Sequence, residues 1–199
     1  YFGGVNEPKI PLIVARFLDD SNKVVILEAL KTLKRMQFNY DVSVLLPYSQ
    51  SMSGIEHEQV MEIIGTRANA ELVPHLSAYL NGSSEQLNEF FADIVATMSD
   101  RKNFEKFLRR LMLEEKPAQQ HAIDCIKKFA NKNLSRIAHE LNSHELEFVR
   151  KAAQGLVVNL IDGEDLERIE GFALSDNPQL RERAIKSLGK SANRGAISI

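Results

Sequence analysis

The stretch LNSHELEFVRKAAQGLVVNLIDGEDLERIEGFALSDNPQLRERAIKSLGKS (141–191) decides the fold, because it shows one pattern twice. A leucine is followed by a polar break, LNSHE (141–145) and then LSDNP (174–178), and each break leads into a run with apolar residues at helical spacing. Apolar residues at i, i+3, i+4 and i+7 indicate the buried face of an α-helix. The stretch therefore predicts that a helix begins after each break.

The same kind of break recurs along most of the chain, at LDDSN (18–22), LNGSS (80–84) and LEEKP (113–117), with a further break near QSMSG (50–54). The period is about 31 residues, which falls within the range of stacked repeat proteins. Between breaks the helical spacing is clearest in two sets of residues: Phe104, Phe107, Leu108 and Leu111, and then Leu134, Ile137, Ala138 and Leu141. Each period holds two such runs of roughly 12 to 15 residues, which predicts a helical hairpin.

No run of strict alternation argues for a sheet, so the expected fold is all-α. We expect one array over residues 1–199, with about six hairpins at 21–50, 53–82, 83–115, 116–143, 144–176 and, incomplete, 177–199, and a half repeat at 8–20. Asp176-Asn177-Pro178 predicts a helix start, because Pro suits the first helical position and Asn caps it.

These units resemble the short HEAT-like repeats of bacterial multidomain proteins and phycobilisome lyase subunits. The matching features are a Val149-Arg150 or Leu180-Arg181 step, followed shortly by Ala152-Ala153 or Ala184-Ile185. The segment EIIGTRANAELVPHLSAYL (62–80) also matches, and the resemblance covers about residues 18 to 190. It implies a right-handed α-solenoid that serves as a protein-binding scaffold or regulatory module.

The dipeptides His139-Glu140 and His144-Glu145 suggest a metal site at first sight. A zinc protease helix needs His at i and i+4, whereas these two lie five apart, about 140° around a helix, and the break places them on different helices. HEAT-like hydroxylases of the deoxyhypusine type hold iron with His-Glu after the Arg step, where this chain has Lys151-Ala152 and Arg183-Ala184. We therefore expect neither a metal nor any other cofactor.

Other catalytic constellations are also missing from the sequence. Cys125, between Ile123 and Ile126, is expected to be a buried and inert thiol. There is no Gly-rich phosphate loop, and the chain has no Trp, while its Phe residues mostly sit at core spacing. We expect a protein that is not an enzyme. The single Cys fits a reducing compartment and predicts a cytoplasmic location.

One charge pattern departs from the net charge of -2. In a solenoid the second helix of each hairpin lines the concave surface, and the residues opposite its apolar face point toward a partner. At matching offsets these residues form what we call the basic stripe: Lys102, Lys106, Arg109, Lys132, Arg136, His139 and Arg168, diluted at its end by Glu164 and Glu167.

We expect the basic stripe to bind an acidic peptide or domain, because charge complementarity gives specificity and fast association. A nucleic acid, as bound by HEAT-like DNA glycosylases, is the alternative partner for the same stripe. A further alternative is that these side chains only keep an exposed face in water.

The ends of the sequence carry a prediction about context. Residues 8–18 are expected to form the second helix of a hairpin, and residues 195–199 to begin another. Because half repeats leave apolar faces uncapped, we expect a segment of a longer protein with other domains, or self-association.

Overall fold

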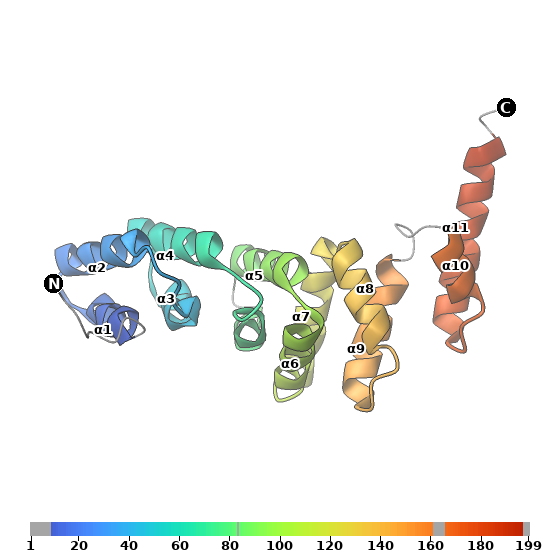
Figure 1. Ribbon diagram of the computed structural model, residues 1–199, viewed down its shortest axis with the longest axis horizontal. Coiled ribbons are helices and arrows are strands. Elements are labelled where there is room, and N and C mark those ends of the chain that lie inside the picture. Colours follow the sequence, from blue (N-terminus) through green and yellow to red (C-terminus); the bar gives the residue numbers. More distant parts are fainter. Residues whose placement is uncertain (1–8, 83, 161–165, 197–199) are drawn as a thin grey trace. The chain divides into compact units, whose positions relative to one another are not determined.

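The computed structural model describes residues 9–82, 84–160 and 166–196, and within these ranges all regular structure is helical (Figure 1). The predicted all-α class is therefore confirmed. The chain forms two compact units, Tyr1–His75 and Leu76–Ile199. We call them unit 1 and unit 2 and describe each by itself.

Unit 1 is built around helix α2, which packs against α1, η2 and α4. Asn22 starts α2, because its side-chain oxygen accepts a hydrogen bond of 3.0 Å from the backbone N–H of Val24. Leu30, Leu33 and Ile64 are completely buried between these helices. The elements are α1 (Ile10–Ala15), the 3-10 helix η2 (Arg16–Asp19), α2 (Lys23–Arg35), the 3-10 helix η3 (Val42–Leu45), α3 (Leu46–Ser51) and α4 (Gly54–Arg67).

Arg67, the last residue of α4, closes the end of α2. Its guanidinium donates hydrogen bonds to the carbonyl oxygens of Lys34 at 3.1 Å, of Phe38 at 3.4 Å and of Met36. It also lies 4.8 Å from the centre of the Tyr40 ring, whose hydroxyl donates to the Leu33 carbonyl. Carbonyls at a helix C-terminus have no partner inside the helix, so a cation that binds several of them stabilises that end.

Unit 2 begins within the 3-10 helix η4 (Val73–Tyr79) and continues through α5 (Glu85–Met98), α6 (Arg101–Leu111), α7 (Lys116–Phe129), α8 (Lys132–Leu141), α9 (Glu147–Leu160), α10 (Leu166–Ala173) and α11 (Pro178–Ala196). The predicted apolar faces of α6 and α8 are buried, with no member more than 1% exposed: Phe104, Phe107, Leu108, Leu111, Leu134, Ile137, Ala138 and Leu141. These side chains form the core beneath both helices.

Polar side chains fix the starts of the helices in unit 2. The side chains of Ser84, Asp100 and Asn131 cap α5, α6 and α8 by accepting hydrogen bonds from backbone N–H groups of the first turn. Asn177 caps α11 in the same way, at 2.9 Å from the N–H of Gln179, and Pro178 is the first helical residue. The helix start predicted at residues 176–178 is therefore confirmed.

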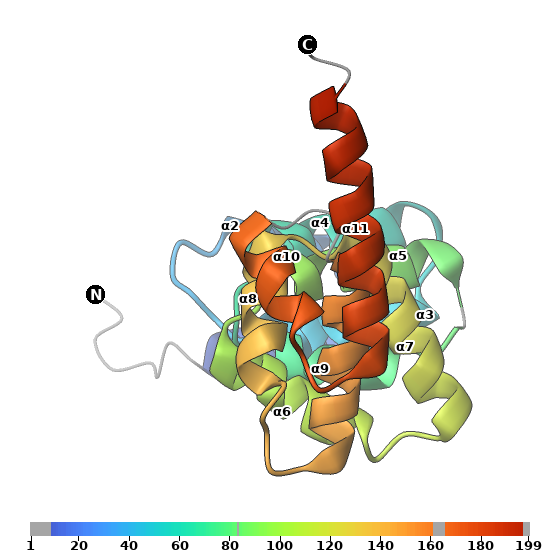
Figure 2. The same cartoon turned by 90° about the vertical axis from the view of Figure 1, so that its right-hand side faces the viewer.

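Equivalent hydrogen bonds join helices of unit 2 to the turns that precede them, and a further bond joins two helices. The Arg150 guanidinium donates to the His144 carbonyl at 2.9 Å, and Arg181, further along by one period, donates to the Ser175 carbonyl at 2.8 Å. Asn131 donates to the Ala96 carbonyl at 3.2 Å. Among consecutive helices the closest packing joins α8 to α9 and α10 to α11, and Figure 2 shows the second pair side by side.

Two predicted features differ from the structure. The second helical runs of the hairpins at 21–50 and 53–82 are shorter than the predicted 12 to 15 residues, being η3 with α3 and then η4. Pro47 and Pro74 lie in these segments, and proline lacks the N–H that a continuous helix needs. No second helix begins at residue 195, because α11 continues through Ala196 without a proline to stop it; residues 197–199 lie outside the described part of the chain.

Candidate functional site

Six of the seven members of the basic stripe lie on α6 and α8, two amphipathic helices that pack against each other. Lys102 and Lys106 on α6 and Lys132 on α8 are exposed, on the side away from the buried residues of each helix. None of the three ammonium groups has an acidic partner within 4.0 Å in residues 9–82, 84–160 and 166–196. Their charge is therefore available to a ligand.

The other members of the stripe are occupied within the protein. Arg109 is half-buried and binds Glu105 at 2.8 Å, and Glu145 lies 3.7 Å away. Arg136 lies 3.8 Å from Glu140, which also faces Arg101 at 3.9 Å. Arg109 joins α6 to the turn before α9, whereas the contacts of Arg136 lie within α8, so both arginines already have acidic partners within the protein.

The two remaining members of the stripe differ again. His139 is exposed and places its ring edge-on to Phe172 of α10, with ring centres 5.5 Å apart. Arg168 lies in α10, but its side chain is outside the described residues. The exposed cations of the stripe that remain for a partner are Lys102, Lys106 and Lys132, which we call the lysine triad.

The carboxylate of Glu105 on α6 binds two side chains, one of which lies in the turn before α9. Its carboxylate binds Arg109 and accepts from the Nε2 of His144 at 3.3 Å, while the Nδ1 of His144 accepts from the N–H of Leu146 at 3.1 Å. Hydrogen bonding to Arg109, followed by that to His144, lowers the pKa of Glu105, and desolvation partly opposes the shift. His144 lies in the turn between α8 and α9, so the expectation that both histidines lie on helices is wrong for His144.

The lowered pKa of Glu105 predicts a pH-dependent contribution to stability. A carboxyl whose folded pKa lies below its unfolded value of about 4.3 stabilises the fold above that value and loses the effect as pH falls through the folded pKa. We expect Glu105→Gln to lower the free energy of unfolding by about 1 kcal/mol at pH 7 and by progressively less in acid. Urea unfolding across this pH range measures the difference, and a constant difference at all pH values contradicts the assignment.

Within residues 9–82, 84–160 and 166–196, no group of three or more His, Cys, Asp and Glu residues lies close enough to hold an ion. Cys125 is buried, at 6% exposure, and burial raises the pKa of its thiol. A thiol with a raised pKa is a poor nucleophile at neutral pH.

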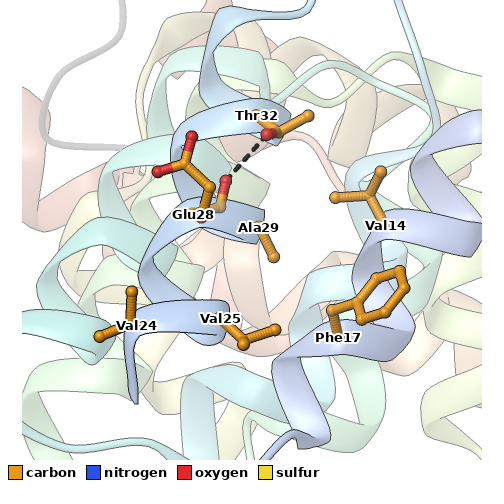
Figure 3. A pocket seen from close by; sticks show the side chains of 7 residues that line it. All are labelled: Val14, Phe17, Val24, Val25, Glu28, Ala29 and Thr32. Atoms are coloured by element: carbon orange, nitrogen blue, oxygen red, sulfur yellow. Dashed lines mark hydrogen bonds between the residues drawn. The ribbon is translucent and has the colours of Figure 1, made fainter. Parts of the chain in front are cut away.

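An apolar groove of about 410 Å³ lies in unit 1 between α1, η2 and α2 (Figure 3). Its lining includes Phe17 and Val24, which are 50% and 72% exposed, and Glu28 is its one charged lining residue. Thr32 donates to the Glu28 carbonyl at 2.8 Å and so does not offer its hydroxyl proton to a ligand. The groove has none of the cationic groups that an acidic partner requires.

Sequence reasoning missed a second groove, of about 370 Å³, between α7 and α9. Lys116, Lys127 and Lys151 surround its apolar floor of Ile123 and Phe148. Lys127 is paired with Asp124 at 2.9 Å and Lys151 with Glu147 at 2.5 Å, so most of its cationic charge is neutralised. The sequence signal for this groove is the set of lysines on α7 and α9, which are the first helices of their predicted hairpins, whereas the basic stripe was predicted on second helices.

A scan against models of known protein families finds no match for this chain, and no curated protein matches its sequence. Among the described residues, no helix combines the length and the apolar character that a membrane crossing requires.

Proposed function

We propose that this chain is a non-catalytic, right-handed α-solenoid of HEAT-like hairpins that binds an acidic segment of a partner protein through the lysine triad. The observation that carries the proposal is the lack of acidic partners around Lys102, Lys106 and Lys132, within the described residues, on helices whose arginines are paired. Unpaired cations attract carboxylates locally, and a net charge of -2 on the whole chain repels an acidic segment only weakly.

The repeat part of the proposal is supported by contacts that return at one period. Arg150 and Arg181 bind carbonyls of the turns that precede their helices, and Asn131 and Asn133 bind carbonyls at the end of the preceding hairpin's first helix. Contacts between nearest neighbours at a fixed spacing are typical of stacked repeats.

The single buried thiol, Cys125, fits a reducing compartment, and we propose a cytoplasmic location on that basis.

The test compares charge reversals on two surfaces of unit 2. A fluorescent peptide of Glu, Asp and Ser is titrated with the wild-type chain and with Lys106→Glu/Lys132→Glu, and fluorescence anisotropy is recorded. We expect about tenfold weaker binding by this variant, since each exposed charge pair contributes up to about 1 kcal/mol and reversal replaces attraction by repulsion. Circular dichroism is expected to stay unchanged, because both side chains are exposed.

The matched control is Lys116→Glu/Lys151→Glu, which changes the net charge equally but alters the groove between α7 and α9. Equal affinity of wild type and the triad variant contradicts the proposal. Loss of binding only in the control variant moves the site to that groove. Duplex DNA is titrated in parallel, and tighter binding of DNA than of the peptide at the same salt concentration favours a nucleic acid as partner.

A further inference from the structure

A part-buried cluster in unit 2 brings an imidazole, a thiol and an amide together. His121 and Cys125 lie one turn apart on α7, with 3.4 Å between His121 Nε2 and Cys125 Sγ. Asn88 comes from the middle of α5, which packs against α7, and its Nδ2 lies 3.1 Å from the same ring nitrogen. Asn88 is 1% exposed and Cys125 is 6% exposed.

The hydrogen bonds of this cluster are incomplete. Nε2 carries either one proton or one in-plane lone pair, so it cannot accept from the Asn88 amide and from the Cys125 thiol with good geometry at once. Asn88 Oδ1 is buried and has no hydrogen-bond partner in the described part of the chain. Leaving a buried polar atom unpaired costs about 1–3 kcal/mol, so such an atom calls for an explanation.

The geometry fits a tetrahedral metal ion. With a Zn–S bond of about 2.3 Å and a Zn–N bond of about 2.05 Å, the separation between Nε2 and Sγ closes an N–Zn–S angle of about 103°, close to the tetrahedral value. Turning the Asn88 amide over exchanges its nitrogen and oxygen, which occupy nearly equivalent positions, and directs Oδ1 toward the same point. One ion would then bind the ring nitrogen, the sulfur and the amide oxygen together, and Nδ2 would take the buried position that Oδ1 now holds.

The surroundings also favour a cation. The carboxylates of Asp124, Glu89 and Glu85 are close enough to affect the charge of the Cys125 thiol, against one ammonium group, that of Lys128. Lys128 itself lies 3.7 Å from Glu89 and 4.0 Å from Glu85. The carboxylates near the sulfur therefore outnumber the ammonium groups, and such an arrangement favours a cation over an anion.

We propose that His121, Cys125 and Asn88 bind one thiophilic divalent cation, with Zn²⁺ as the best fit and a water molecule as the fourth ligand. His121 binds through its neutral Nε2, and Cys125 binds as thiolate, so its thiol proton is released to solvent on binding. Soft sulfur and imidazole ligands select such ions over Mg²⁺ and Ca²⁺. The site is independent of the lysine triad and joins α5 to α7.

Cobalt is the probe for this site, because tetrahedral Co²⁺ bound to a thiolate absorbs light. Cys125 is the single cysteine of the chain, so every thiolate-to-cobalt signal reports this cluster. Reduced, oxygen-free wild-type protein is expected to develop a near-ultraviolet charge-transfer band that saturates at one equivalent of Co²⁺ and disappears on addition of Zn²⁺.

Variants assign each ligand separately. Cys125→Ser is expected to abolish the band, His121→Ala to weaken Co²⁺ binding at least tenfold, and Asn88→Asp to tighten it, because a carboxylate is a stronger ligand than an amide. A purely structural role of Asn88 gives no such gain. His139→Ala, which changes an exposed histidine on α8, is the control and should bind as wild type does.

Two results overturn the proposal: no charge-transfer band in folded wild-type protein at millimolar Co²⁺, or a band whose affinity is unchanged in His121→Ala. A second measurement needs no variant. Zn²⁺ is expected to slow alkylation of Cys125 in the wild-type protein at least tenfold, and an unchanged alkylation rate contradicts the site.

Discussion

Replacing Arg67 by alanine is expected to lower the free energy of unfolding of unit 1 by about 3 kcal/mol. The substitution removes charge-assisted hydrogen bonds to the carbonyls of Lys34, Met36 and Phe38 and the contact with the Tyr40 ring. It also leaves partly buried carbonyls at the end of α2 without their donor. Hydrogen exchange of peptides from α2 and α4, followed through denaturation, measures the loss in unit 1 separately from unit 2, since the chain need not unfold in a single step.

The Arg67 prediction has two informative comparisons. Arg35→Ala removes an exposed arginine from the last turn of α2 and is expected to change stability by less than about 0.5 kcal/mol. Arg67→Lys keeps the charge but not the planar group that reaches several carbonyls, so it should recover only part of the loss. Equal stability of Arg67→Ala and Arg35→Ala would show that the carbonyl contacts do not stabilise the unit.

Replacing Phe107 by alanine is expected to cost about 3–5 kcal/mol in unit 2, the usual range for a buried aromatic residue. Phe107 is completely buried and stacks on Phe104, with ring centres 5.9 Å apart and planes 8° from parallel. Both rings project from the inner face of α6, beneath Lys102 and Lys106. We therefore expect Phe107→Ala to loosen α6 and weaken peptide binding as well.

Phe107 and Lys106 are neighbours in sequence, so comparing substitutions at the two positions separates an effect on stability from an effect on peptide binding. Phe107→Leu conserves most of the apolar volume and is expected to cost no more than about 1.5 kcal/mol, with binding retained. Lys106→Glu should change binding while the urea midpoint stays within error. If Phe107→Ala unfolds at the same urea concentration as wild type, the core beneath α6 is packed differently from this description.

The helices and their buried faces follow from spacing alone. Phe104, Leu108, Leu134 and Ile137 were predicted to face the core because helical geometry puts residues three and four apart on one side, and all four are buried. The second elements of the first two predicted hairpins are short because they contain prolines. The apolar pattern of these segments favours a continuous helix, so the pattern alone does not predict the interruption. The prediction of a single array is different, because it concerns how compact units are placed relative to one another. Periodicity within a helix contains no information about that placement.

The basic stripe could be predicted only in part. Periodicity places Lys102, Lys106 and Lys132 on exposed faces, which the structure agrees with, but it contains nothing about the neighbouring helices. Arg109 meets Glu145, and Arg101 meets Glu140, across dozens of residues of sequence. Which cations remain unpaired is therefore a property of tertiary packing. The same holds for Asn88 and His121, which come together only when α5 packs on α7.

The hydrogen bonds that join helices to a neighbouring helix or to the turn before them share one property that bears on how this chain tolerates substitution. Arg67, Asn131, Arg150 and Arg181 all donate to backbone carbonyls rather than to side chains. Every residue type supplies a carbonyl, so the accepting segment can change its side chains freely while the link remains. Only the donor position is constrained. An assembly joined in this way can diverge widely in its surface, and hence in the partners it binds, at little cost to the packing of its helices.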